Sequence, residues 1–171
     1  MDAACRKLVR DLGEAGWLRY CVTAEHGGVL ADFDARAICL MRETLAYHDG
    51  LADFSFAMQG LGSGAISLFG TPQQKNAWLP RVAKGTAIAA FALSEPDAGS
   101  DVAAIAATAR RDGGGYVLDG SKTWISNGIE GSCFALLVKT DLAAEPRHKG
   151  MSMFIAQKGP GFTVSRKLEK L

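Results

Sequence analysis

The sequence predicts an α+β fold in which an N-terminal helical domain, residues 1–86, precedes an antiparallel β-sandwich or barrel domain, residues 87–171. Three observations predict it. Up to about residue 86, apolar residues recur at helical spacing. Beyond that point they form short runs separated by glycine, proline and charged residues, as in strands joined by turns. No helical pattern lies between the later runs, which argues against repeated βαβ units.

Four helices are expected in the first half of the chain. The second follows Asp34, a favourable N-cap residue. The fourth opens with Thr71, Pro72 and Gln74, which can form a capping box with proline at the first helical position. The predicted helices span residues 3–15, 35–47 and 52–69, with a fourth running from Pro72 to the turn before Gly85.

Residues 52–69 are apolar on nearly every side, which predicts a buried helix. Within this segment, Gly60, Gly62 and Gly64 superficially resemble a dinucleotide-binding loop. That fingerprint requires a preceding strand and G-x-G-x-x-G spacing, whereas these glycines follow a helical pattern and read G-x-G-x-G. We therefore interpret them as small residues that let a buried helix approach its neighbours closely.

Strand-forming stretches follow one another in the second half. The glycines in the middle of "ATARRDGGGYVLDG" predict a strand, a turn and a second strand. The last stretch is followed by "RKLEKL", which shows neither a closing helix nor an obvious tail, so we expect a truncated chain. The predicted stretches are residues 87–94, 107–120, 133–140, 151–157 and 162–166.

Composition excludes several classes of function. The 171 residues are 48% hydrophobic and 22% charged, as in a globular protein, and the net charge of +1 gives no basis for binding nucleic acid or an anionic membrane. No apolar run approaches the ~20 residues needed to span a bilayer, and the start lacks the apolar core of a signal peptide. We expect a cytoplasmic protein. Its four cysteines and three histidines are scattered, so the sequence supports no metal site.

A polar turn closes the first predicted strand, in the stretch "FALSEPDAGSD" at residues 91–101. Pro96 removes a backbone donor, and Gly99 permits backbone geometry that other residues resist. Such a turn can present N–H groups beside the hydroxyls of Ser94 and Ser100, which suits a planar ligand with several acceptors, or a phosphate. Taken alone, an ordinary polar turn is the simpler interpretation, because these residue types dominate turns anyway.

A tryptophan precedes an Asn-Gly turn in the second motif, "SKTWISNG", residues 121–128. Trp124 could cover the face of a flat aromatic ligand while Ser126 binds its edge. A core tryptophan near a hairpin turn is the alternative, and it would be preferred for this motif alone.

In this order and followed by strands, the two motifs resemble those of the acyl-CoA dehydrogenase family. The resemblance covers "FALSEPDAGSDVAAIAATARRDGGGYVLDGSKTWISNG", the helix "GTPQQKNAWLPRVAKG" before it, and "LGEAGWL" and "HGG" near the start. It therefore extends over nearly the whole chain. It implies an N-terminal helical domain, a middle β domain that binds flavin and a C-terminal helical bundle that is missing here, with both ends of the present chain incomplete.

The resemblance implies FAD as the cofactor, bound by residues of both motifs. Leu93 N–H and the Ser94 hydroxyl would bind the pyrimidine edge of the flavin, and Trp124 would pack on the isoalloxazine. The family often has threonine where this chain has Ser94 and Ser126, so a hydroxyl is kept and a methyl contact is lost. The implied cofactor-binding residues are Phe91, Ala92, Leu93, Ser94, Gly99, Ser100, Trp124, Ile125 and Ser126, with Ser100 also near the acyl-CoA.

The family reaction removes a proton α to a thioester carbonyl and a hydride from the β carbon, giving a 2-enoyl-CoA in fatty acid metabolism. The base is a glutamate of the C-terminal bundle, and no residue here matches it, so we assign no catalytic residue and expect this chain alone to be inactive. Glu95 is a tempting substitute, but it belongs to the cofactor-side motif. Electron-transfer flavoprotein is the implied electron acceptor, and the full-length protein is expected to be a homotetramer or homodimer.

Two alternatives stay open at this stage. An acyl-CoA oxidase or a flavin monooxygenase would keep the fold and use oxygen as oxidant. An inactive fragment or split subunit would keep only residual ligand binding. Within the family, the helix around Phe54, Met58 and Leu61 resembles the segment that closes the acyl pocket, and the small Ala57 beside them leads us to expect a medium, branched or cyclic acyl chain.

Overall fold

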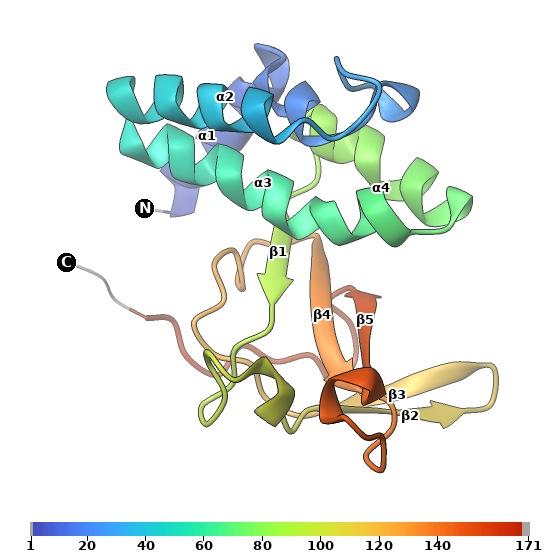
Figure 1. Ribbon diagram of the computed structural model, residues 1–171. Coiled ribbons are helices and arrows are strands. Elements are labelled where there is room, and N and C mark those ends of the chain that lie inside the picture. Colours follow the sequence, from blue (N-terminus) through green and yellow to red (C-terminus); the bar gives the residue numbers. More distant parts are fainter. Residues whose placement is uncertain (1, 169–171) are drawn as a thin grey trace.

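The computed structural model describes residues 2–168 and arranges them in two layers, with α-helices above a five-stranded sheet (Figure 1). The strand β1 (Ala89–Ala92) descends from the helical layer, and β4 (Cys133–Lys139) stands beside it. The predicted α+β class is confirmed, because the helices come first along the chain and the strands follow. No helix within residues 2–168 is long and apolar enough to cross a membrane.

The helices begin and end close to the residues that the sequence predicts. The Asp34 carboxylate accepts hydrogen bonds from the backbone N–H groups of Arg36 (2.8 Å) and Ala37 (3.4 Å). The predicted capping box is present, since Gln74 N donates to Thr71 Oγ1 (3.2 Å) and Thr71 N donates to Gln74 Oε1 (2.8 Å). The α-helices are α1 (Asp2–Glu14), α2 (Ala35–His48), α3 (Gly50–Phe69) and α4 (Pro72–Ala83). Short 3-10 helices are η1 (Trp17–Cys21), η2 (Ala24–His26), η3 (Val102–Ala104) and η4 (Arg147–Gly150).

The sheet is mixed, which corrects the expectation of a purely antiparallel one. Its other strands are β2 (Thr108–Asp112), β3 (Gly115–Asp119) and β5 (Met151–Ala156). β4 pairs in parallel with β1 and, through Lys139 and Thr108, with β2, whereas β2–β3 and β4–β5 are antiparallel. Only a tight hairpin forces antiparallel pairing, and the long connection from β1 to β4 leaves either direction open. Apolar patterning alone therefore could not predict the strand directions.

Residues 162–166 do not form the expected strand. They pair with no other strand within the described residues 2–168, although four other predicted stretches contain β1, β2–β3, β4 and β5. An apolar run becomes a strand only where a neighbouring strand offers N–H and C=O groups for pairing. The pattern indicated an extended segment. Because no strand within residues 2–168 pairs with it, the segment does not form the predicted strand.

One apolar core joins the helical layer to the sheet. Leu18, Phe56 and Leu79 are among its largest fully buried side chains. On the sheet side, the same core contains Ala89 and Cys133, which are paired in register as the first residues of β1 and β4. The helical layer and the β1–β4 part of the sheet therefore share one buried surface.

Gly62 explains how α3 lies so close to β1. A Cβ atom at this position would lie 2.7 Å from Ala89 Cβ and 2.8 Å from Ala90 N, too close for any side chain. One turn earlier, the buried Gln59 accepts a hydrogen bond from Ala89 N through Oε1 (3.1 Å). The close approach expected from the glycines is thus present at Gly62, whereas a Cβ atom at Gly64 would meet nothing within 4 Å.

The expectation that α3 is buried on every side is wrong. Phe56 and Ile66 lie in the core, but Phe54, Leu61 and Leu68 are exposed. A helix that is apolar all round needs cover on all sides, and the described residues leave part of the α3 surface exposed. The sequence pattern therefore predicted the apolar character of the helix correctly. It did not predict how much of the helix surface is buried within residues 2–168.

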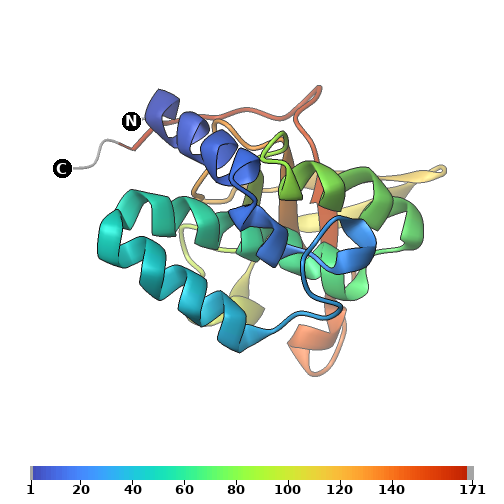
Figure 2. The same cartoon turned by 90° about the horizontal axis from the view of Figure 1, so that it is seen from above.

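The β2–β3 hairpin is the least buried part of the sheet. Every residue of β3 is exposed, and in the view from above the hairpin projects beyond the helical layer (Figure 2). A small cluster of Ala107, Ala109 and Val138 packs where β2 meets β4. The hairpin is thus attached at one end, close to the segments that carry the two motifs.

Candidate functional site

The first motif forms a closed turn directly after β1. Glu95 N donates to Ala98 O (2.9 Å) and Ala98 N donates back to Glu95 O (3.2 Å), so the residues around Pro96 are held in a narrow loop. Leu93 and Ser94 lie between the strand end and this loop. The turn predicted from the sequence is present, and it fixes the place where the strand stops.

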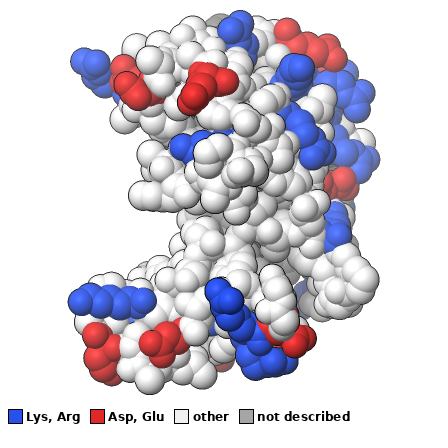
Figure 3. All heavy atoms as spheres, turned by 90° about the vertical axis from the view of Figure 1, so that its right-hand side faces the viewer, with Lys and Arg blue, Asp and Glu red and all other residues white. Residues whose placement is uncertain are grey.

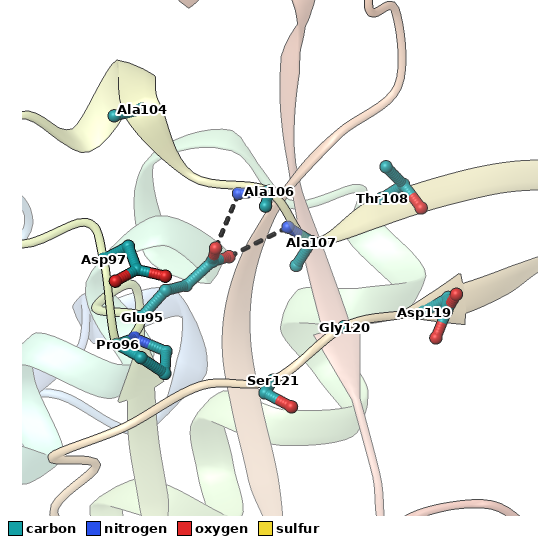
Figure 4. A pocket seen from close by; sticks show the side chains of 10 residues that line it. All are labelled: Glu95, Pro96, Asp97, Ala104, Ala106, Ala107, Thr108, Asp119, Gly120 and Ser121. Carbon is teal, nitrogen blue, oxygen red and sulfur yellow. Dashed lines mark hydrogen bonds between the residues drawn. The ribbon is translucent and has the colours of Figure 1, made fainter.

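The Glu95 side chain turns inward and ties this loop to the segment before β2. Only 7% of Glu95 is exposed. Its carboxylate accepts hydrogen bonds from Ala106 N (2.5 Å) and Ala107 N (3.0 Å), as Figure 4 shows. Burial alone would raise the pKa of Glu95, but these two N–H groups and the Lys122 ammonium together lower its pKa below the ordinary value. Glu95 is therefore an ionised structural residue.

Lys122 joins the second motif to the first. Its Nζ atom donates to Leu93 O (2.9 Å) and to Glu95 Oε1 (2.7 Å). The next residue, Thr123, donates its backbone N–H to Ser94 O (2.9 Å). Two segments 29 positions apart in the sequence, counted from Leu93 to Lys122, are thereby held side by side.

Trp124 follows these ties and points away from the core. Its side chain is 71% exposed, and its φ of 59° lies in the left-handed region that a bulky residue rarely adopts. Asn127, with φ of 62°, donates from Nδ2 to Ala89 O (2.8 Å) and accepts from Gly131 N (2.6 Å). The turn is therefore held in a strained shape from both sides. Backbone strain of this kind is found mainly where function requires it.

The predicted site residues fall into two groups. Leu93 and Ser94 lie beside Thr123 and Trp124, while Gly99 and Ser100 lie beyond the turn, where no hydrogen bond within residues 2–168 joins them to the second motif. Phe91 and Ala92 belong to β1 and pair with Ala135 and Leu136, and Ile125 accepts from Gly128 N (3.1 Å). Within residues 2–168 the hydroxyls of three predicted residues make no hydrogen bond: Ser94, Ser100 and Ser126.

Sequence reasoning missed the residues that hold the site together. Glu95 was considered only as a substitute base, and neither Lys122 nor Thr123 nor Asn127 was given a role. The only features of the sequence that hinted at this contact were a lysine two residues before Trp124 and an acid directly after Ser94. A charge in a turn is usually solvated, so only the fold could pair these two across the chain.

A shallow pocket of about 390 Å³ lies beside the Glu95 carboxylate (Figure 4). Glu95, Pro96, Gly120 and Ser121 are among its lining residues, and none of the nine predicted cofactor-binding residues is. A space-filling view shows a hollow between the helical layer above and the sheet layer below, with few charged residues on its wall (Figure 3). The lining of this shallow pocket and the predicted cofactor-binding residues therefore do not overlap.

Comparison with known proteins decides the family. Residues 2–86 match the family model described as acyl-CoA dehydrogenase, N-terminal domain, and residues 90–171 match the one described as acyl-CoA dehydrogenase, middle domain. The chain belongs to the acyl-CoA dehydrogenase family. The resemblance inferred from the two motifs is thus confirmed.

Two curated relatives from this family show the level of similarity. Mitochondrial isovaleryl-CoA dehydrogenase from Pongo abelii is 36% identical over 168 residues, which cover 97% of this chain and 39% of that protein. Mitochondrial short-chain specific acyl-CoA dehydrogenase from Homo sapiens is 38% identical over 167 residues, covering 95% of this chain and 39% of that protein. The chain thus spans about two fifths of the length of these relatives.

Solved structures agree with the fold. The crystal structure of acyl-CoA dehydrogenase complexed with FAD from Bacillus anthracis has a TM-score of 0.82 at 34% identity, covering 97% of this chain and 28% of that chain. The structure of electron transferring flavoprotein of Acidaminococcus fermentans contains a chain with a TM-score of 0.87 at 36% identity, covering 96% of this chain and 43% of that chain. The mixed sheet below helices is therefore the arrangement found in solved structures of the family.

Proposed function

We propose that this chain supplies part of the flavin site of an FAD-dependent acyl-CoA dehydrogenase, which converts an acyl-CoA thioester to the 2-enoyl-CoA. One observation carries the proposal: the second motif is fastened to the first by Thr123 N and Lys122 Nζ, so that the exposed Trp124 follows directly after the tie to Leu93 and Ser94. Family membership and the FAD complex of the Bacillus anthracis relative support it.

The residues present fit a flavin. A flat ring system needs an apolar surface on its face and hydrogen-bond partners along its edge. Trp124 offers an exposed indole held by strained backbone, and the Ser94 and Ser126 hydroxyls make no hydrogen bond within residues 2–168 that a ligand would have to break. An exposed tryptophan on strained backbone is costly without a ligand to cover it.

In this proposal the chain binds and orients the cofactor. When bound, FAD supplies the acceptor for the substrate hydride. The Ser94 hydroxyl and Leu93 N–H would donate toward the pyrimidine edge, where fixed donors would stabilise the negative charge that develops. Trp124 would cover the ring face and exclude water, while Ile125 and Ser126 would line the reactive edge. Gly99 and Ser100 would bind the ribityl-phosphate side, and Ser100 would also lie near the acyl-CoA.

Glu95 is unsuited to be the base of the reaction. It is buried, its carboxylate already accepts from two N–H groups and an ammonium, and its pKa is lowered, so it is a poor acceptor for a substrate proton. Residues 1–171 alone are therefore not expected to dehydrogenate acyl-CoA.

The electron acceptor and the acyl-CoA substrate are also part of the proposal. The structure of the Acidaminococcus fermentans flavoprotein supports an electron-transferring flavoprotein as acceptor. The isovaleryl-CoA relative supports a branched acyl chain, whereas the short-chain relative supports a shorter one. The cytoplasmic location and the homotetramer or homodimer stay predictions, and the two relatives named here are mitochondrial proteins.

Titration of the purified chain with FAD tests the proposal. We expect saturable quenching of flavin emission, lost when Trp124→Ala removes the stacking ring. Trp17→Phe, in the half-buried Trp17 of the helical layer, is the matched control and should bind FAD normally. Equal binding by the Trp124→Ala variant would contradict the proposed site. Anaerobic addition of isovaleryl-CoA should leave the flavin absorbance unchanged, and rapid bleaching would mean that a base lies within these residues.

A further inference from the structure

The Glu95–Lys122 ion pair is unusual for its burial. Its side chains are 6% and 10% exposed, whereas the Arg42–Asp53 pair between α2 and α3 leaves half of the Arg42 side chain in solvent. Removing two charges from water is costly, and a buried pair often contributes no more stability than apolar side chains in the same place. Net stability is therefore a poor explanation for an ion pair at this position.

The placement of the pair offers a better explanation. Lys122 lies two residues before Trp124, and Glu95 lies one residue after Ser94. The ammonium bonds both to the Glu95 carboxylate and to Leu93 O, a carbonyl of the segment expected to meet the flavin edge. A shift of either motif along the other would break both bonds and leave a buried charge unpaired. The free-energy cost of the unpaired charge therefore favours one relative position of the two motifs.

We propose that Lys122 is a positioning residue, which fixes the spacing between the Leu93–Ser94 edge and the Trp124 ring so that both can meet one flavin. This inference rests on the proposed function. Thr123 N donates to Ser94 O beside the pair, so the exchange rate of this amide reports whether the two segments keep their relative position. Lys122 thereby acts through other residues and need not touch the cofactor itself.

Two variants separate positioning from stability. The double variant Glu95→Gln with Lys122→Met removes both charges, so none is left buried and unpaired. Lys122→Arg keeps the charge, but the larger, planar guanidinium does not reproduce the position of a compact ammonium between two acceptors. The control is the double variant Arg42→Met with Asp53→Asn, which removes a bidentate pair (2.8 and 2.9 Å) far from both motifs along the chain.

The measurements on residues 1–171 are the thermal midpoint, the FAD dissociation constant and the amide hydrogen exchange of Thr123. We expect both Lys122 variants to fold, to bind FAD about tenfold more weakly or worse, and to exchange the Thr123 amide faster. The control should lower the midpoint without changing FAD affinity. Wild-type affinity and Thr123 protection in a folded Lys122 variant would overturn the inference, and if the double variant does not fold, Lys122→Arg decides alone.

Failure of the proposed function can be distinguished from failure of the positioning role. If the wild-type chain binds no FAD, the proposed function fails, and the Thr123 exchange rate with the indole NMR signal of Trp124 still tests the positioning role. Faster exchange and a displaced indole signal in the Lys122 variants would support that role, and unchanged values would exclude it.

Discussion

The apolar scaffold and the turns that carry the two motifs are built from different interactions. The scaffold, formed by the helices with β1 and β4, is held by a continuous core that includes Leu18, Phe56 and Leu79. The motif turns contain few buried apolar side chains and depend instead on directed contacts from Glu95 and Lys122. Dispersion and burial hold the first region, and hydrogen bonds hold the second.

This difference matches what each region must do. The hydrophobic effect is non-directional, so apolar burial stabilises a fold without selecting hydrogen-bond geometry at single atoms. Hydrogen bonds to charged groups are directional and fix positions to within a fraction of an ångström. A site that recognises the edge and face of one planar ring needs the second kind of contact, whereas its supporting layer needs only the first.

The largest expected effect lies in the scaffold. Leu79→Ala removes a side chain that is 0% exposed, and a buried leucine lost this way costs about 2–5 kcal/mol of unfolding free energy. We expect chemical denaturation, followed by circular dichroism, to show a chain at or near the limit of folding. Leu40→Ala, at an exposed position on α2, is the control and should change stability by no more than about 0.5 kcal/mol. Equal losses for both would show that the core is not where the structure places it.

The next effect tests the contact between the two layers. Gly62→Ala would force a Cβ atom to within 2.7 Å of Ala89 Cβ, and we expect a loss of about 1–3 kcal/mol. Gly64→Ala meets nothing within 4 Å on the same helix, so its higher helix propensity should stabilise the chain by about 0.5–1 kcal/mol. The two glycines are two residues apart, so opposite signs in the same denaturation assay would confirm the packing of α3 on β1. Equal signs would contradict it.

The sequence predicts the scaffold better than it predicts the site. Local chemistry determined the Asp34 cap and the Thr71–Gln74 capping box, and both are present. Strand direction and the exposure of α3 were not predictable, because both depend on which segments pack together. Pairing through β4 and the exposed side of α3 are properties of the whole fold rather than of any window of sequence.

The candidate site divides in the same way. The motif residues Ser94 and Trp124 were recognisable by their neighbours along the chain, and whether they bind flavin stays a prediction. The Glu95–Lys122 pair was not recognisable, because each residue alone is an ordinary charge in a polar turn. Only a tertiary contact makes the two charges partners, and sequence spacing carries no information about it.

A third prediction concerns the acid sensitivity of the motif turns. The pKa of Glu95 is lowered in the folded chain, so the unfolded chain binds a proton first as the pH falls below about 4.3. This contribution to stability is present above that pH and is lost as the pH drops through the folded pKa. We expect the unfolding free energy in urea to fall less steeply with acid in the Glu95→Gln, Lys122→Met double variant than in the wild type.

The matched control for acid sensitivity is Asp34→Asn on the scaffold. Hydrogen bonds from Arg36, its backbone N–H first, lower the pKa of the exposed Asp34 as well, but solvent screens that carboxylate and asparagine still caps the helix. Its effect on the acid slope should be smaller than that of the Glu95 variant. A larger effect of Asp34→Asn would mean that the buried tie does not dominate the acid response.

The smallest expected effect is on the reactivity of the cysteine thiols. It tests whether the two layers of the scaffold open together. Burial raises the pKa of Cys21 to about 12 and that of Cys133 to about 11, so neither thiol should react with a disulfide reagent in the native chain. Cys39 is exposed and should react at once.

Cys21 lies in the helical layer and Cys133 in β4, yet both belong to one core. In a variant with Cys5 and Cys39 changed to Ser, we therefore expect both buried thiols to become reactive at one common rate in mild urea, because a shared core opens as one unit. Two separate rates would show that the helical layer and the sheet unfold independently, as the predicted division near residue 86 would allow.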